Sequence, residues 1–135
     1  MRNPMISVFC AAAGLTFAVL APTAALSDSG STPVLHTELE GMDGTEANIV
    51  HWEVEPGFET KRHIHSGHVF VYVLDGSITI DVEGREPQTF SAGEAFYELP
   101  DVPMVGRNAS PSENARFVVF QVGPTGEPLM VDHPQ

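Results

Sequence analysis

The stretch ETKRHIHSGHVFVYVLDGSITI, from Glu59 to Ile80, holds three histidines within six residues and continues into a run of β-branched and aromatic residues. His63 and His65 are two positions apart, so on an extended backbone both imidazoles point to the same side. Imidazole is a ligand for zinc, copper, iron and nickel. The sequence therefore predicts that His63 and His65 bind one metal ion.

The third histidine of this stretch, His68, lies three positions after His65. In a regular strand its side chain would face the opposite way. It reaches the same ion only if Ser66 and Gly67 form a bulge, which glycine permits. We include His68 among the candidate ligands on that condition.

The segments around this stretch also have the patterns of strands. ANIVHWEVE (47–55) and SITIDVEG (77–84) alternate apolar and polar residues, whereas HVFVYVLDG (68–76) is apolar throughout and predicts a strand buried on both faces. PQTFSAGEAFYELPDVP (87–103) predicts two short strands, and ARFVVFQVG (115–123) one more. Strands at this spacing, separated by Gly and Pro, indicate an all-β sandwich or barrel. Aromatic residues at alternating strand positions are assigned to the core or a dimer interface: Trp52, Phe70, Tyr72, Phe96, Phe117 and Phe120.

The beginning of the chain differs from the rest. Arg2 precedes the apolar run MISVFCAAAGLTFAVLA (5–21), and small residues and a polar stretch follow it. This order is typical of a cleaved signal peptide, here residues 1–27. It predicts a periplasmic or secreted protein with no membrane segment after cleavage. Cys10 would leave with the signal, so neither a disulfide nor a thiolate site is expected.

The charge of the chain excludes one class of partner. Eighteen acidic residues stand against six basic ones, which gives a formal net charge of −12. So acidic a surface repels phosphate backbones, and nucleic-acid binding is not expected.

Two motifs resemble those of the cupins, a family of small jelly-roll β-barrels. Gly57, His63 and His65 match the opening of the first cupin motif, G-x5-H-x-H-x3,4-E-x6-G, and Gly76 matches its end. AGEAFYELPDVPMVGRNAS (92–110) resembles the second motif, G-x5-P-x-G-x2-H-x3-N. The resemblance covers about residues 45–123. It implies a cupin jelly-roll barrel with a metal site of three His and one Glu.

This sequence departs from that ligand set at two positions. The glutamate position holds Val69 and the second-motif histidine position holds Met104. On one interpretation His63, His65, His68 and Met104 bind an ion, and the soft thioether of Met104 favours copper. On the other, tight metal binding is lost, Met104 fills space in the core, and the pocket takes an organic ligand. Zinc, iron, manganese and nickel remain alternatives to copper.

Three further residues are candidates for lining a pocket. Glu98 and Tyr97 lie on the strand that leads into the second motif, where Glu98 can place a carboxylate at the pocket mouth and act as a general acid or base. Arg107 can bind a substrate carboxylate or form a surface ion pair. Asn108 is expected to fix a turn through hydrogen bonds to the backbone.

The predicted organisation is a signal peptide (1–27), an N-terminal segment (28–44), a cupin barrel (45–123) and a C-terminal tail (124–135). The apolar strand at 68–76 favours a homodimer. The predicted function is an exported barrel that binds a metal ion or small molecule through its histidines. The alternatives are a cupin metalloenzyme (a dioxygenase, isomerase or lyase) and a structural barrel without metal.

Overall fold

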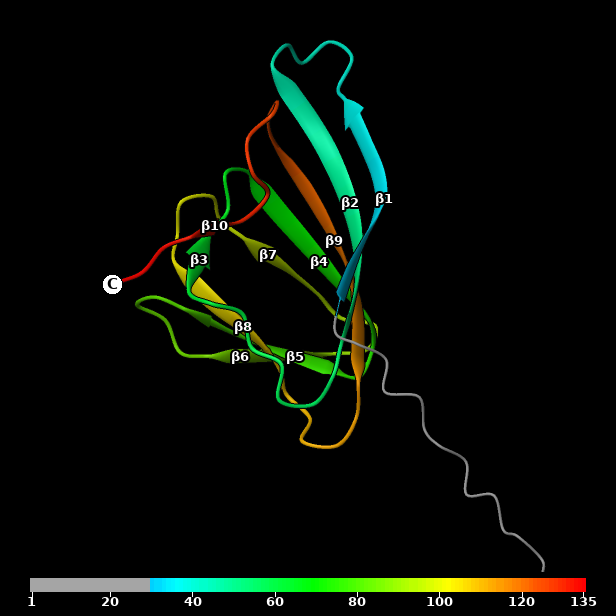
Figure 1. The fold of residues 1–135 in the computed structure, drawn as a ribbon, viewed down its shortest axis with the longest axis vertical. Coiled ribbons are helices and arrows are strands. Elements are labelled where there is room, and N and C mark those ends of the chain that lie inside the picture. Colours follow the sequence, from blue (N-terminus) through cyan, green and yellow to red (C-terminus); the bar gives the residue numbers. More distant parts are fainter. Residues whose placement is uncertain (1–29) are drawn as a thin grey trace, which may run out of the picture.

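The computed structural model describes residues 30–135, so the predicted signal peptide lies outside the described residues. Ten strands and no helix make up this part of the chain (Figure 1). The strands are β1 (Gly30–Glu38), β2 (Thr45–Val54), β3 (His63–Ile64), β4 (His68–Asp75), β5 (Ser77–Val82), β6 (Gln88–Ser91), β7 (Ala95–Glu98), β8 (Met104–Asn108), β9 (Ala115–Pro124) and β10 (Val131–Asp132). The all-β prediction is confirmed. Nowhere in residues 30–135 is there a helix with the length and hydropathy to cross a membrane.

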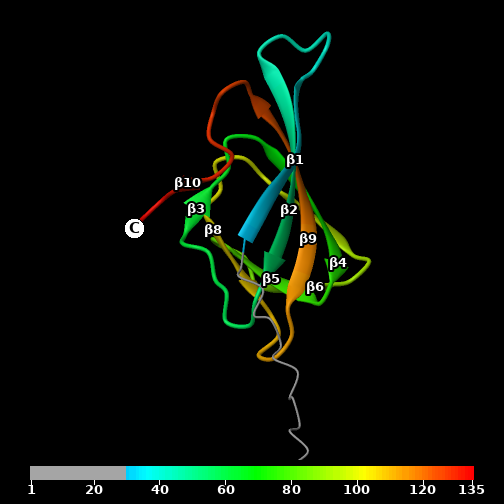
Figure 2. The ribbon, with the colours of Figure 1, turned by 45° about the vertical axis from the view of Figure 1, so that its right-hand side comes forward.

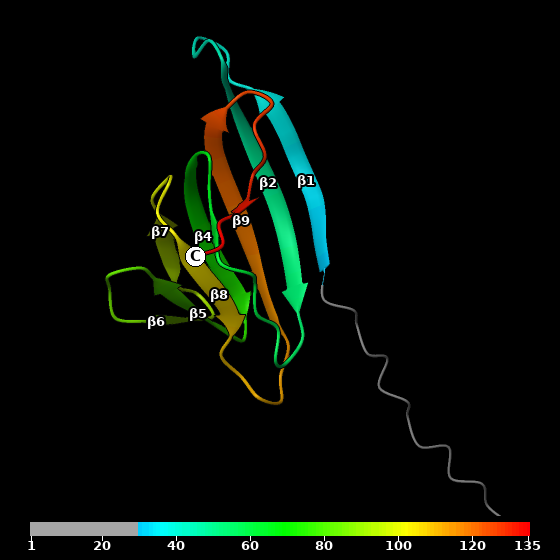
Figure 3. The same cartoon turned by 60° about the vertical axis from the view of Figure 1, so that its left-hand side comes forward.

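Two five-stranded antiparallel sheets form the barrel. The first has the order β1-β2-β9-β4-β7 and the second the order β10-β3-β8-β5-β6. Figure 3 shows the first sheet with β1 at its free edge, and Figures 1 and 2 show the β1–β2 hairpin extending past one end of the barrel. Because β1 pairs with β2 along almost its whole length, the segment before Ala47 contains an edge strand.

The core lies between the inner faces of the two sheets. Val54, Ile78, Ile80 and Ala115 are buried together, and aromatic residues pack against them. The alternation along β2 and β9 places Trp52 and Phe117 on the inner face, where their rings stack with centroids 6.1 Å apart. The chain therefore closes one end of its core with aromatic rings.

Strand β4 corrects one expectation. Its residues alternate between exposed and buried, so the strand is not buried on both faces in the single chain. Val69, Val71 and Val73 face the core, whereas Phe70 and Tyr72 lie on the outer face of the first sheet and are nearly half exposed. A continuous apolar run does not distinguish a strand buried on both faces from one with an apolar outer face.

Asn108 and Gly76 fix turns at the ends of barrel strands. The buried Asn108 donates through Nδ2 to the carbonyls of Val54 (3.1 Å) and Glu113 (2.8 Å), and its Oδ1 accepts from the Ser110 N–H (2.9 Å). The prediction that Asn108 fixes a turn is confirmed. At the end of β4, Gly76 has φ +70°, and a Cβ there would lie 2.6 Å from the carbonyl oxygen of Asn114, so only glycine fits.

Glu46 ties the edge strand and the C-terminal tail to the barrel. Its carboxylate accepts hydrogen bonds from His36 on β1 (2.9 Å), Asn48 on β2 (2.9 Å) and the backbone N–H of Gly126 (3.1 Å). These hydrogen bonds, that of His36 first, lower the pKa of Glu46 from 4.5 to about 2. A hydrogen-bonded carboxylate stabilises the fold only while it is ionised.

The first prediction follows from this carboxylate. Because its folded pKa is depressed, its contribution to stability is complete above pH 4.5 and is lost as pH falls toward about 2. Glu46→Gln is expected to lower the urea midpoint at pH 7 and to flatten its decline in acid. The exposed Glu86 gives the matched control, Glu86→Gln. Equal pH profiles for the two variants would show that Glu46 does not anchor the fold.

Candidate metal site in the barrel cavity

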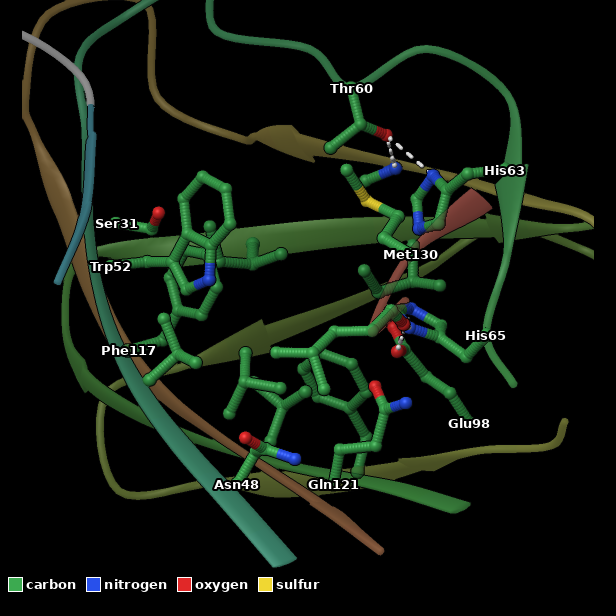
Figure 4. Close-up of a pocket in the computed structure, with 18 of the residues that line it drawn as sticks. Ser31, Asn48, Trp52, Thr60, His63, His65, Glu98, Phe117, Gln121 and Met130 are labelled. Carbon is green, nitrogen blue, oxygen red and sulfur yellow. Dashed lines mark hydrogen bonds and ion pairs between the residues drawn. The ribbon is translucent and has the colours of Figure 1, made fainter. Parts of the chain in front are cut away.

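A cavity of about 210 Å³ lies between the two sheets. Most of its lining is apolar. Figure 4 shows Thr60, His63, His65 and Glu98 together on one side, with Gln121 nearby, whereas the polar Ser31 and Asn48 lie away from this cluster. Strands β3, β7 and β9 and the loops beside β3 supply the cluster and Gln121. The polar end of the cavity is the candidate site.

His63 and His65 are both directed into the barrel, as their spacing predicts. They are 5% and 7% exposed, and their rings lie at 90° with centroids 5.0 Å apart. Each Nδ1 lies within hydrogen-bonding distance of a backbone carbonyl, that of Lys61 for His63 (2.8 Å) and that of Leu129 for His65 (2.7 Å). In the neutral ring, Nδ1–H donation to a carbonyl leaves the Nε2 lone pair available, which is how metal-binding histidines are commonly held.

Glu98 belongs to the same cluster. Its side chain is buried at the end of β7, and its Oε2 lies 3.2 Å from Nε2 of His65. The expectation that Glu98 sits at the pocket mouth is corrected, because the carboxylate is inside the cavity. In the pairing of β4 with β7, Glu98 is directly opposite the buried Val69. The carboxylate missing from position 69 is thus present on the neighbouring strand.

Gln121 is a polar residue that the sequence analysis did not identify. It lies opposite Val69 on the other side, in the pairing of β4 with β9, and it is 2% exposed. Its Nε2 donates to the Ser66 hydroxyl (3.3 Å). The Gln121 side chain lies close enough to His65 to stabilise the protonated form of its ring and so to raise its pKa. Within residues 30–135, however, no donor has good hydrogen-bonding geometry with Gln121 Oε1. A buried acceptor without a partner is costly, and it marks a position where a ligand or ion can bind.

The two histidines have opposite pKa shifts. Burial lowers the pKa of His63 below 6.5. Burial also lowers the pKa of His65, but the hydrogen bond and negative charge of Glu98 outweigh this, and the net shift is upward. His65 therefore retains a proton to higher pH than His63 does, and an ion binding to its Nε2 replaces that proton.

The other predicted ligands lie elsewhere. His68 is exposed on the outer face of β4, where its Nδ1 is hydrogen-bonded to the Tyr97 hydroxyl and its ring stacks on that of Tyr97. No bulge turns His68 inward, so neither His68 nor Tyr97 joins the cavity. Met104 is buried on β8 opposite His63 in the strand register but is not part of the cavity lining. Arg107 borders the cavity, but Gly106 and Asn108 beside it on β8 face inward and Arg107 pairs with Thr79, so its side chain lies on the opposite face of the strand.

Gly67 explains why the backbone takes this path between His65 and His68. A Cβ at Gly67 would lie 2.3 Å from the carbonyl oxygen of Val122 and 2.6 Å from Cα of Gly123. These atoms belong to the backbone of β9 and cannot move aside cheaply. The close contact holds the loop that carries His65 against the first sheet.

The second prediction tests this contact. Gly67→Ala is expected to lower the free energy of unfolding by about 2–4 kcal/mol, because the new methyl group overlaps backbone atoms. Gly106→Ala is the milder control, since its Cβ would meet only side-chain atoms, the end of Ile80 at 3.3 Å and the Thr60 methyl at 3.9 Å. Urea unfolding of both variants gives the measurement. A loss below about 0.5 kcal/mol for Gly67→Ala would contradict the close packing.

The donor set suits a metal ion in its chemistry. Two imidazoles, one carboxylate and the buried amide oxygen of Gln121 are gathered at one end of the cavity. Two neighbouring ligands of one ion in octahedral geometry lie about 3 Å apart, given bonds of ~2.1 Å, and His65 Nε2 and Glu98 Oε2 have a similar separation. Within residues 30–135, no three His, Cys, Asp or Glu side chains already form a complete metal-binding group.

Comparisons with known proteins agree with this architecture. The cupin domain family matches residues 50–121. The beta-alanine degradation protein BauB of Pseudomonas aeruginosa is 35% identical over 75 residues, which cover 53% of this chain and 78% of BauB.

Solved structures share the fold at low sequence identity. A conserved protein with a double-stranded β-helix domain from Klebsiella pneumoniae superposes with TM-score 0.62 at 20% identity, covering 82% of this chain and 88% of that one. An RmlC-like cupin from Methanocaldococcus jannaschii gives 0.61 at 20%, covering 82% and 94%. DMSP lyase DddQ from Ruegeria pomeroyi gives 0.59 at 18%, covering 78% of this chain and 51% of DddQ. Family match and barrel together show that this chain belongs to the cupin family.

Proposed function

We propose that this cupin binds a divalent transition-metal ion at the polar end of its cavity. His63, His65 and Glu98 would hold the ion, and the Gln121 amide oxygen would complete or adjust its coordination. The single observation that carries this is the buried contact between His65 Nε2 and Glu98 Oε2, 3.2 Å apart, beside a second imidazole whose Nδ1 is likewise hydrogen-bonded to a carbonyl. An ion with open positions polarises a bound oxygen or activates water.

The donor types favour some metals over others. Two histidines and a carboxylate suit iron, manganese, nickel or zinc. The argument for Cu(I) rested on a thioether from Met104, which is not part of the cavity lining, and the thioether that does line the cavity belongs to Met130, which is 40% exposed. We therefore propose a borderline or hard divalent ion instead of copper.

Metal loading tests the proposal directly. The purified protein is stripped with a chelator, reloaded with each of the four metals in turn, and analysed for bound metal. We expect close to one ion per chain for at least one metal, and a loss of that ion in His65→Ala. His68→Ala is the matched control, because His68 lies outside the cavity. Equal metal content in the two variants would refute the site.

A metal-free binding barrel is the second candidate function. It is favoured by the direct ion pair of His65 with Glu98, which already gives each buried group a partner. Under this alternative no metal binds in the reloading experiment, and metal ions leave the melting temperature unchanged.

We also propose that the outer face of the first sheet pairs with a second copy of the chain. Phe70, Tyr72, Leu74, Tyr97 and Phe120 are 37–49% exposed there, and Phe70 stacks on Tyr97 with centroids 5.1 Å apart. At ~200 Å² per large side chain, the five expose about 450 Å². Two such faces would bury about 900 Å² before the rim is counted, near the lower limit of a specific interface.

Sedimentation tests this pairing. The wild type is expected to sediment as a dimer and Phe70→Glu as a monomer. The second copy is the proposed occupant because the face is apolar on a strongly acidic chain, so pairing removes apolar area from water without joining charged groups. A wild type that stays monomeric at about 100 μM would refute it.

A further inference from the structure

The cavity has two unlike ends. Figure 4 shows Trp52 and Phe117 on one side and His63, His65 and Glu98 on the other. Away from this cluster the lining is mainly aromatic and branched, with the polar Ser31 and Asn48 among these residues: Val50, Trp52, Phe58, Val71, Ile78, Ile80, Phe96, Phe117 and Val119. A ligand that fills this space must be apolar over most of its surface and polar at one end.

The size of the cavity limits the apolar part. A dry apolar cavity of about 150 Å³ holds a benzene molecule. The cavity here, about 210 Å³, is larger by roughly the space of a small head group. The ligand therefore has a body about the size of a benzene ring and one compact polar group.

The charges at the polar end select the head group. The titratable side chains that face the cavity are His63, His65 and Glu98, because the Arg107 side chain lies on the other face of β8. With a divalent ion bound beside Glu98 and both imidazoles neutral, the cluster would carry a net positive charge. An anionic oxygen group fits this environment better than an amine or a second apolar group.

We propose that the cavity binds a small carboxylic acid with an apolar body about the size of a benzene ring. The body lies between Trp52, Phe117 and Val119, and the carboxylate is directed toward His63 and Glu98. This inference rests on the proposed metal site, because the ion supplies the net positive charge that the ligand carboxylate meets.

The single tryptophan of the chain, Trp52, reports on the cavity. Phenylacetate is titrated into the metal-loaded and the metal-free protein while Trp52 fluorescence is followed, and bound metal is measured on the same samples. We expect phenylacetate to bind the loaded protein at least tenfold more tightly than 2-phenylethanol, which lacks the charge, and than acetate, which lacks the ring. Removal of the metal by a chelator should weaken the binding of phenylacetate at least tenfold.

The same substitution at two neighbouring residues of β9 separates ligand binding from folding. Val119 lies between Phe117 and Gln121 on the inner face of β9 and lines the cavity. Val119→Phe is expected to abolish phenylacetate binding while the metal content stays near wild type. Val118→Phe adds the same ring on the opposite face of β9, outside the cavity, and should retain binding within about threefold, which is less than 1 kcal/mol. If Val119→Phe does not fold, the preference for phenylacetate over 2-phenylethanol and acetate still tests the proposal.

The possible outcomes are distinct. Metal without any preference for phenylacetate overturns this inference and leaves the proposed metal site standing. Absence of metal with absence of phenylacetate binding overturns both. Tighter binding of 2-phenylethylamine than of phenylacetate shows that Glu98 meets the ligand as an unpaired anion, and it overturns the carboxylate assignment.

Discussion

Glu98→Gln is expected to weaken metal binding by about 2–4 kcal/mol, or roughly thirty- to a thousandfold. A complete structural zinc site contributes ~10–16 kcal/mol, so about a quarter of that is a reasonable share for one ligand of four. Glutamine keeps the shape of the side chain and removes its negative charge. The carboxylate is 7% exposed and lies 3.2 Å from Nε2 of His65, so water cannot easily replace it.

The measurement is competition for the metal against a chelator of known affinity. Glu86→Gln is the control, because Glu86 is exposed and its substitution removes the same charge from the chain. Circular dichroism of the metal-free variants checks that both fold. An unchanged metal affinity in Glu98→Gln would mean that Glu98 is not a ligand of the ion.

The histidine pair could be predicted from sequence because its geometry is local. His63 and His65 are two positions apart, and any extended backbone places their side chains on one side. The resemblance to the cupin motifs predicted the fold and identified Val69 and Met104 as departures from the usual ligand set. Neither kind of reasoning depends on which strands are neighbours.

Glu98 and Gln121 could be placed in the site only with knowledge of which strands are neighbours in the sheet. Both lie opposite Val69, one on β7 and one on β9, and the register of the first sheet brings them to the cluster. A one-residue shift in register would turn either side chain outward. The only local signal was Gln121 itself, a polar residue in phase with Phe117 and Val119 on the inner face of an otherwise apolar strand.

The placement of His68 depended on a contact that spacing does not encode. Gly67 is available for a bulge, but the structure uses it to bring the loop against the backbone of β9. Strand β4 then begins with His68 outside and Val69 inside. A glycine permits several backbone paths, and packing chooses among them.

Met104→His is expected to strengthen metal binding by about 2–4 kcal/mol, the contribution of one added imidazole. Position 104 pairs with His63 across β3 and β8, so side chains at the two positions lie on the same face of the sheet. The site would then have three histidines and Glu98. Without metal, the variant should be less stable by about 1–3 kcal/mol, because it buries a polar ring where a thioether was.

Met104→Leu is the matched control, since leucine fills similar space without a donor atom. Metal affinity and melting temperature, with and without metal, separate three cases. If Met104→His gains metal affinity and Met104→Leu does not change it, position 104 lies beside the ion and the natural Met104 is a packing residue. A loss for leucine would show that the thioether is a ligand after all. If histidine only destabilises, position 104 does not reach the ion, and the affinity then depends on His63, His65 and the residues opposite Val69.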